Sequence, residues 1–170
     1  TDMSSHLAAA SKEQIEEGDY EAEDLPVILS NIADEFRQKG QSHALLGEQE
    51  QARVAYRQAA NYCVEFVEAM REHRDVIRDQ MWEDAPAGYT EAMWYGLISR
   101  DTDLCEDIAA ETLELDDSYL SEFGETDPDS AVRYFNAKVL AAAILDHERF
   151  EELAGKLDRA IELSVPADVR

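Results

Sequence analysis

The acidic side chains of one helical segment are the strongest candidates for chemistry in this sequence. Five carboxylates recur at offsets of 3, 7, 10 and 14 residues, which aligns them along one helix face. They are Glu65, Glu68, Glu72, Asp75 and Asp79. Adjacent like charges raise one another's pKa or recruit a cation. A Mg²⁺-dependent helical nucleotide hydrolase uses comparable spacing, but it needs acids that converge from two helices. Because these lie on one helix and alternate with arginines, we favour a solvated face over a cation ladder.

Other catalytic and metal-binding patterns are missing from the sequence. None of the four histidines (His6, His43, His73 and His147) has a Glu three residues before it, as di-iron bundles require. The seven glycines are isolated, and no P-loop, GxGxxG or GxSxG motif is present. The sequence therefore predicts no cofactor and a non-enzymatic protein, with a metal-dependent hydrolase on the ladder as the remaining enzyme hypothesis.

The charge of the chain restricts its partners. The sequence carries 39 acidic residues against 15 basic ones, of which four are lysines, and a net charge of −24, yet 45% of it is apolar. An acidic, lysine-poor surface around an ordinary apolar content resembles that of proteins from salt-accumulating halophiles. Phosphate contact needs a basic face, so we expect no direct binding of nucleic acid. An acidic helical protein could instead mimic nucleic acid in the basic cleft of a partner.

The sequence also indicates where the chain resides. No apolar run approaches the roughly 18 residues of a membrane span, and the N-terminus lacks a signal peptide's pattern, so we expect a cytoplasmic protein. Cys63 and Cys105 lie within helical patterns and are expected as buried free thiols, although a disulfide between them stays open. The chain opens with Thr1 rather than Met, which leaves open a processed end or an expression scar, and the ending SVPADVR leaves open a longer parent.

Hydrophobic periodicity predicts an all-α fold of about six helices in three antiparallel hairpins, a TPR-like or α-solenoid-like stack without strands. Asp24 and Pro26 open the first helix and Gly47 ends it. The second helix could extend to Trp82, with a break near residues 72–74. Further helices are expected at 90–99, 102–115, 128–145 and 150–163, with linkers at 83–88 and 121–130. The resulting segments are an acidic N-terminal stretch (1–23) and hairpins at 24–85, 86–126 and 127–166, in one compact domain.

Two of these hairpins resemble tetratricopeptide repeats. The first matches the family's alternation of aromatic, small and alanine positions at Phe36, Gly40, His43, Ala52, Tyr56 and Ala59. The last matches it at Leu140, Ala141, Ile144, Phe150, Leu153, Leu157 and Ala160, followed by Pro166. Lys39 stands where the family usually has Leu. The small residues Gly40, Gly96 and Ala141 are spaced 56 and 45 apart, unlike the family's repeat of about 34. The resemblance implies close helix approach at the small residue and a concave protein-binding groove.

Residues 93–105 resemble a second family, the immunity proteins numbered forty-nine in polymorphic toxin systems. The likeness rests on the family's W…L..RD…LC pattern, which is matched by Trp94, Arg100, Asp101, Leu104 and Cys105. It implies an all-helical cytoplasmic protein that binds and neutralises a cognate toxin. The leading interpretation is nevertheless broader. We expect a non-enzymatic protein–protein interaction module of a halophilic organism, whose protein partner, which could be a toxin, and oligomeric state stay open.

The charge predicts a salt-dependent fold. Repulsion among the acidic residues acts over a Debye length of roughly 10 Å at 0.1 M salt and about 3 Å at 1 M. The melting temperature should therefore fall as KCl is lowered from molar to about 0.1 M. Thermal unfolding followed by circular dichroism across this range tests the expectation, and a melting temperature independent of KCl would contradict the halophile interpretation.

Overall fold

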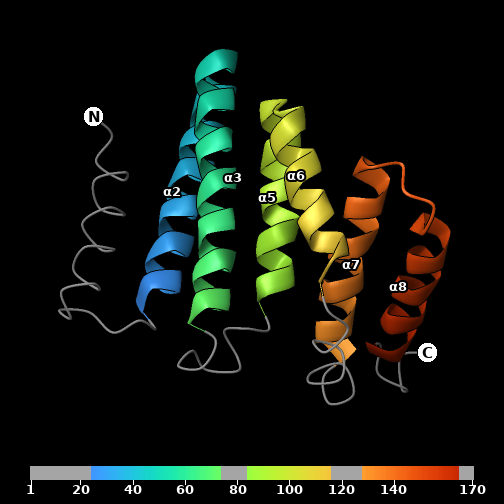
Figure 1. Cartoon of the computed structure of the whole chain (residues 1–170). Coiled ribbons are helices and arrows are strands. Elements are labelled where there is room, and N and C mark those ends of the chain that lie inside the picture. The colour runs from blue at the N-terminus through green and yellow to red at the C-terminus, as the bar shows by residue number, and fades with distance from the viewer. Residues whose placement is uncertain (1–23, 74–83, 116–127, 165–170) are drawn as a thin grey trace. The chain divides into compact units, whose positions relative to one another are not determined.

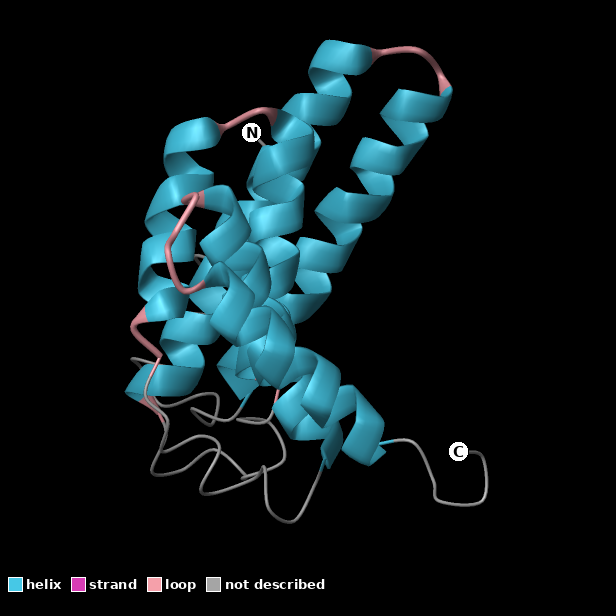
Figure 2. Cartoon of the chain, turned by 90° about the vertical axis from the view of Figure 1, so that its right-hand side faces the viewer, coloured by secondary structure: helices cyan, strands magenta, loops and turns pink. Residues whose placement is uncertain are grey.

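The computed structural model describes residues 24–73, 84–115 and 128–164, and these residues are helical (Figure 1). Six helices are present in them: α2 (Asp24–Leu45), α3 (Gln49–Glu72), α5 (Ala85–Ser99), α6 (Thr102–Leu113), α7 (Pro128–Ile144) and α8 (Phe150–Ser164). Loops are the other structure drawn in the described ranges, which contain no strand (Figure 2). The prediction of an all-α fold with about six helices is confirmed. The acidic segment 1–23 and the proposed extension of the second helix to Trp82 lie outside the described residues.

The chain divides into two compact units between Asp101 and Thr102. In the first unit α3 packs against both α2 and α5, and in the second unit α7 packs against both α6 and α8. The division falls inside the expected hairpin at 86–126 and gives two units where the sequence suggested one compact domain. The physical reason is that α5 and α6 bury their apolar faces against different helices, α3 and α7.

Three helices end in the same backbone arrangement, a Schellman motif. In each, one residue adopts a left-handed conformation, and the N–H of the residue after it donates to the carbonyl five positions earlier. The left-handed residues are Gly47 (φ 78°), Arg100 (φ 61°) and Asp146 (φ 48°). The hydrogen bonds run from Glu48 to His43, from Asp101 to Gly96 and from His147 to Ala142, at 2.9, 3.1 and 2.9 Å. Helices α2, α5 and α7 therefore end in the same C-terminal capping motif, although their lengths differ.

The expected linker at 83–88 is wrong for residues 85–88, because α5 begins at Ala85. Pro86 stands in the first turn, where its missing N–H leaves no helical hydrogen bond unmade. Gly88 lies inside the helix for a packing reason. A Cβ at this position would come within 2.7 Å of Val67 Cγ2 on α3. The residues that suggested a break thus start a helix and let it approach α3 closely.

Aromatic rings connect the three helices of the first unit. Phe36 and Tyr62 stack with ring centroids 5.5 Å apart, and Tyr56 and Tyr95 stack at 6.1 Å. The Tyr56 ring also lies where a Cβ on Gly40 would meet it at 3.1 Å. The close approach expected between Gly40 and the second helix of the first hairpin is therefore present.

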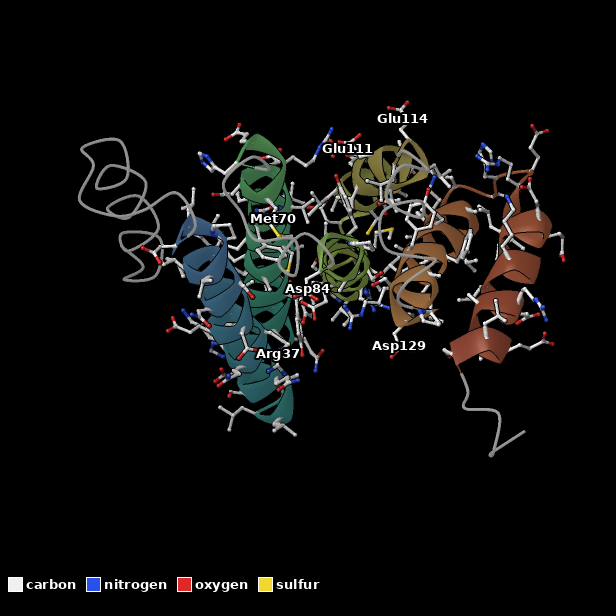
Figure 3. All side chains as sticks on the ribbon, turned by 90° about the horizontal axis from the view of Figure 1, so that it is seen from below. Arg37, Met70, Asp84, Glu111, Glu114 and Asp129 are labelled. Carbon is white, nitrogen blue, oxygen red and sulfur yellow. The ribbon has the colours of Figure 1, made fainter. Side chains whose placement is uncertain are left out.

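A buried lysine on α7 joins that helix to the end of α6 in the second unit. Lys138 on α7 is only 3% exposed, and its Nζ donates to the backbone carbonyls of Leu113 and Leu115 at 3.2 and 2.6 Å. The Tyr134 hydroxyl donates to the Leu115 carbonyl as well, at 3.1 Å. These donors satisfy carbonyls at the end of α6 that the helix itself leaves without partners. In contrast, the acidic Glu111, Glu114 and Asp129 are exposed and project away from the ribbons (Figure 3).

Replacing Arg100 with glycine should stabilise the first unit. A left-handed conformation costs a residue with a side chain roughly 1–2 kcal/mol, and glycine loses about 0.5–1 kcal/mol more backbone entropy on folding. The free energy of unfolding of Arg100→Gly should therefore rise by about 0.5–1 kcal/mol. Urea unfolding at high salt measures it. Ile98→Gly, in the right-handed part of the same helix, is the control and should destabilise by about 1 kcal/mol; equal losses in both variants would contradict the argument.

Candidate functional site

A pocket of about 230 Å³ lies where α2, α3 and α5 meet in the first unit. It is lined by Ser30 and Ala33 of α2, by Cys63 and Phe66 of α3, and by Asp84, Ala87, Gly88 and Glu91 at and within α5. Figure 3 labels Asp84 beside the start of α5 and Arg37 on α2. The pocket therefore combines small and aromatic apolar walls with two carboxylates.

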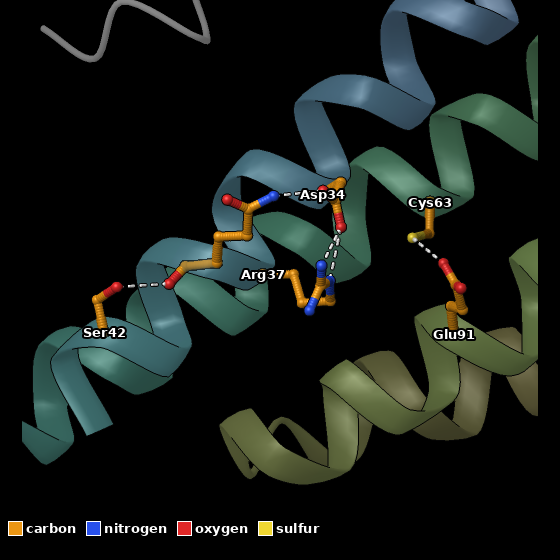
Figure 4. Close-up of polar contacts among 6 residues, drawn as sticks. Asp34, Arg37, Ser42, Cys63 and Glu91 are labelled. Carbon is orange, nitrogen blue, oxygen red and sulfur yellow. Dashed lines mark hydrogen bonds and ion pairs between the residues drawn. The ribbon is translucent and has the colours of Figure 1, made fainter. Parts of the chain in front are cut away.

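Glu91 is the residue that gives this pocket its chemistry. It is the only charged residue among the fifteen of α5, APAGYTEAMWYGLIS. The Cys63 thiol, on the facing helix α3, donates to Glu91 Oε2 at 3.9 Å (Figure 4). The single carboxylate of an otherwise uncharged helix thus lines a pocket, and its side chain is at the same time exposed to solvent.

Burial sets the protonation of the groups around Glu91. Desolvation raises the pKa of the Glu91 carboxyl above its usual 4.5; the charge of Arg37 opposes this rise, and those of Asp34 and Asp84 add to it. Burial also raises the pKa of the Cys63 thiol, and the neighbouring Glu91 charge raises it further. The pKa of Tyr95 rises for the same two reasons. Cys63 is therefore a protonated thiol, which does not suit it to nucleophilic chemistry.

The nearest cation is already engaged by another carboxylate. Arg37 Nε donates to Asp34 Oδ1 at 2.6 Å, and the guanidinium Nη2 lies 2.5 Å from the same oxygen. Gln38 Nε2 donates to Asp34 Oδ2 at 2.6 Å, and the Ser42 hydroxyl donates to the Gln38 carbonyl at 2.9 Å (Figure 4). The Arg37 hydrogen bond, with that of Gln38, lowers the pKa of Asp34. Arg37 thus acts on Glu91 through its electric field, while its guanidinium is bonded to Asp34.

The carboxylate ladder proposed from the sequence is only partly described. Glu65, Glu68 and Glu72 lie on α3, with Glu68 and Glu72 exposed, while Asp75 and Asp79 lie outside the described residues. Within residues 24–73, 84–115 and 128–164, no group of three His, Cys, Asp or Glu side chains could hold a metal ion. The ladder as a cation site stays a prediction.

The five residues of the immunity-family resemblance fall in both units. Trp94 is 50% exposed on α5, Arg100 is the left-handed residue after that helix, and Asp101 accepts an ion pair from Arg57 Nε at 2.7 Å. Leu104 and the buried Cys105 belong to α6 in the second unit. Arg100 and Asp101 thus have structural roles in ending α5. Both cysteines are buried and free, as expected.

A second, larger groove of about 480 Å³ runs along the α2–α3 hairpin. It includes Lys39, His43 and the half-exposed Val54, and the hairpin turn beside it exposes Leu45 and Leu46 at 89% and 73%. His43 contacts Glu48 Oε2 at 2.5 Å across the helix end. This groove is lined by charged groups of both signs, Lys39 and Glu50, whereas the charged residues that line the α2–α3–α5 pocket are both carboxylates, so we take that pocket as the candidate site.

Comparing the chain with protein-family models, with curated proteins and with solved structures found no match. None of the helices in the described ranges is both long and apolar enough to cross a bilayer.

The raised pKa of Glu91 predicts how its substitution changes stability with pH. A carboxyl whose pKa is higher in the fold than in the unfolded chain favours folding below its unfolded value, near 4.5, and loses that contribution as pH rises through the folded value. Glu91→Gln removes this titration. The free energy of unfolding of Glu91→Gln should therefore increase relative to that of the wild type as pH rises from below 4.5 to neutrality.

Chemical unfolding at several pH values, at constant high salt, makes this comparison. Glu68→Gln removes one charge from the exposed part of α3 and is the control, for which a smaller change is expected. A Glu91→Gln difference that shrinks with rising pH would show that the carboxylate is stabilised in the fold and would contradict the assignment.

Proposed function

We propose that this chain is a non-enzymatic protein–protein interaction module that holds part of its partner in the α2–α3–α5 pocket. The observation that carries the proposal is the placement of Glu91, the lone charge of α5, at an open pocket lined by both apolar and polar side chains. Binding sites commonly combine an apolar lining with a few placed polar groups. The likeness of the first hairpin to tetratricopeptide repeats, which bind proteins along grooves between helices, agrees with this use of the pocket.

The chemistry of the pocket favours binding over catalysis. Its thiol is buried and its pKa is raised, and its nearest arginine is engaged by Asp34. General acid–base catalysis by Glu91 would need a second group to hold a reacting atom. The residues lining the pocket include no histidine, lysine or arginine. The halophilic setting proposed from the charge is compatible with a protein partner, because apolar contacts strengthen in high concentrations of excluded salts.

A toxin is the narrower proposal for the partner. It rests on the resemblance of residues 93–105 to immunity proteins, and the half-exposed Trp94 supports it, because tryptophan is enriched at the energetic centres of interfaces. Arg100 and Asp101 add less support, since the end of α5 accounts for both.

Filling the pocket should abolish partner binding. Ser30 lines the pocket from the exposed face of α2, so Ser30→Trp places an indole in it. Gln41→Trp, on an exposed position of the same helix away from the pocket, is the control. We expect the wild type and Gln41→Trp to retain the same protein from a high-salt lysate. Ser30→Trp should bind that protein at least about tenfold more weakly, a loss of about 1.4 kcal/mol of binding free energy.

A photo-crosslinking amino acid at position 30 should then join this protein to the pocket, whereas the same group at position 41 should not. Equal retention by both tryptophan variants, with both folded by circular dichroism, would place the partner elsewhere and refute this use of the pocket.

A further inference from the structure

We propose that the pocket accepts a lysine or arginine side chain presented by the partner protein. This inference rests on the proposed function and adds the chemistry of the occupant. Glu91 supplies the carboxylate, Ala33, Phe66 and Ala87 supply the apolar walls, and Ser30 supplies a hydroxyl near the opening. Long cationic side chains place their methylene stems on apolar surface and their charged ends at polar groups, which is the arrangement this pocket offers.

The charges facing Glu91 favour a cation. Among the described residues, the charges of Asp34 and Asp84 raise the pKa of Glu91, whereas the charge of Arg37 and the hydrogen bond from Cys63 lower it. Arg37 is bound to Asp34 by contacts of 2.5 and 2.6 Å, so its charge is largely balanced there. Cys63 from α3 and Tyr95 from α5 complete the groups around the carboxylate, and burial keeps both of them neutral. An entering cation would offset the charges of Glu91 and Asp84, the two carboxylates that line the pocket.

Other occupants fit the pocket less well. An acidic side chain would meet Asp84 and Glu91. A purely apolar side chain would bury Glu91 further without a partner, and a buried unpaired carboxylate is costly. A hard divalent cation prefers at least six oxygen ligands, and the described residues hold no cluster of three ligating side chains. The guanidinium or ammonium group of a partner therefore matches both the charge and the walls.

High salt does not remove this preference. Screening acts mainly on solvent-exposed charges, and a partly buried pair is screened much less. Glu91 is exposed in the free chain, so this protection from screening arises when the partner covers the pocket. The contact thus suits a protein whose outer charges are screened.

Two small probes of nearly the same shape test the charge of the occupant. Butylguanidinium carries the arginine head group on a four-carbon stem, and butylurea is its neutral counterpart. We expect butylguanidinium to shift the backbone amide signals of Ala87 and Glu91 in NMR spectra and to lower the pKa of the labelled Glu91 carboxyl. Butylurea should bind at least about tenfold more weakly, as loss of a charge-assisted hydrogen bond predicts.

Variants assign the effect to the carboxylate. Glu91→Gln should weaken butylguanidinium binding about tenfold or more, whereas Glu68→Gln should leave it unchanged. Equal binding of the two probes, or unchanged binding by Glu91→Gln, would overturn the inference.

The two proposals fail differently. A partner that is lost from Ser30→Trp but retained fully by Glu91→Gln would keep the pocket as the binding site and overturn only the cationic occupant. A partner indifferent to Ser30→Trp would overturn the proposed function, while the probe titration would still report whether the pocket prefers a cation.

Discussion

The closeness of α5 to α3 at Gly88 is the constraint on which the candidate site depends. With no Cβ, Gly88 lets Val67 and Phe66 of α3 occupy space that any other residue would fill, at 2.7 and 3.0 Å from the missing atom. A larger residue would move α5 outward along its first turns. Ala87 and Glu91 would move with it, and the 3.9 Å contact between Glu91 and Cys63 would lengthen. The pocket is therefore a product of helix packing, and its volume and its electrostatics change together.

Three helices of this chain end in the same capping motif, although its helical hairpins are irregularly spaced in the sequence. The Schellman motifs after α2, α5 and α7 satisfy backbone groups in the same way, but different residues occupy the left-handed position. Across the first of these ends, His43 contacts Glu48, where this motif often places an apolar pair. Across the second, Asp101 binds Arg57 of α3. Polar side chains thus contribute to these two helix ends of the first unit.

The sequence predicted helices well and the pocket poorly, for physical reasons. Apolar periodicity and capping residues are local, so α2, α6, α7 and α8 could be found from Asp24, Thr102, Pro128 and Phe150. Pro86 and Gly88 were misread because a helix start and a linker share the same residue types, and only the contact with Val67 distinguishes them. Glu91 carried one overlooked signal, its position as the sole charge of an apolar helix. Its approach to Cys63, 28 residues earlier, depends on the register of α5 against α3, which no local pattern encodes.

Glu91 differs from the other carboxylates in what its charge does for the fold. Most acids of this chain need only water and counterions, and an exposed carboxylate costs the fold little when salt screens it. Desolvation raises the pKa of Glu91, so ionising this carboxyl costs the fold more than ionising a fully solvated one, and the Arg37 charge and the Cys63 hydrogen bond offset part of that cost. Glutamine has nearly the same volume and could accept the Cys63 hydrogen bond without that cost. The described residues that line the pocket include no basic side chain, and Arg37 is bound to Asp34, which is why we propose a basic side chain of the partner as the occupant.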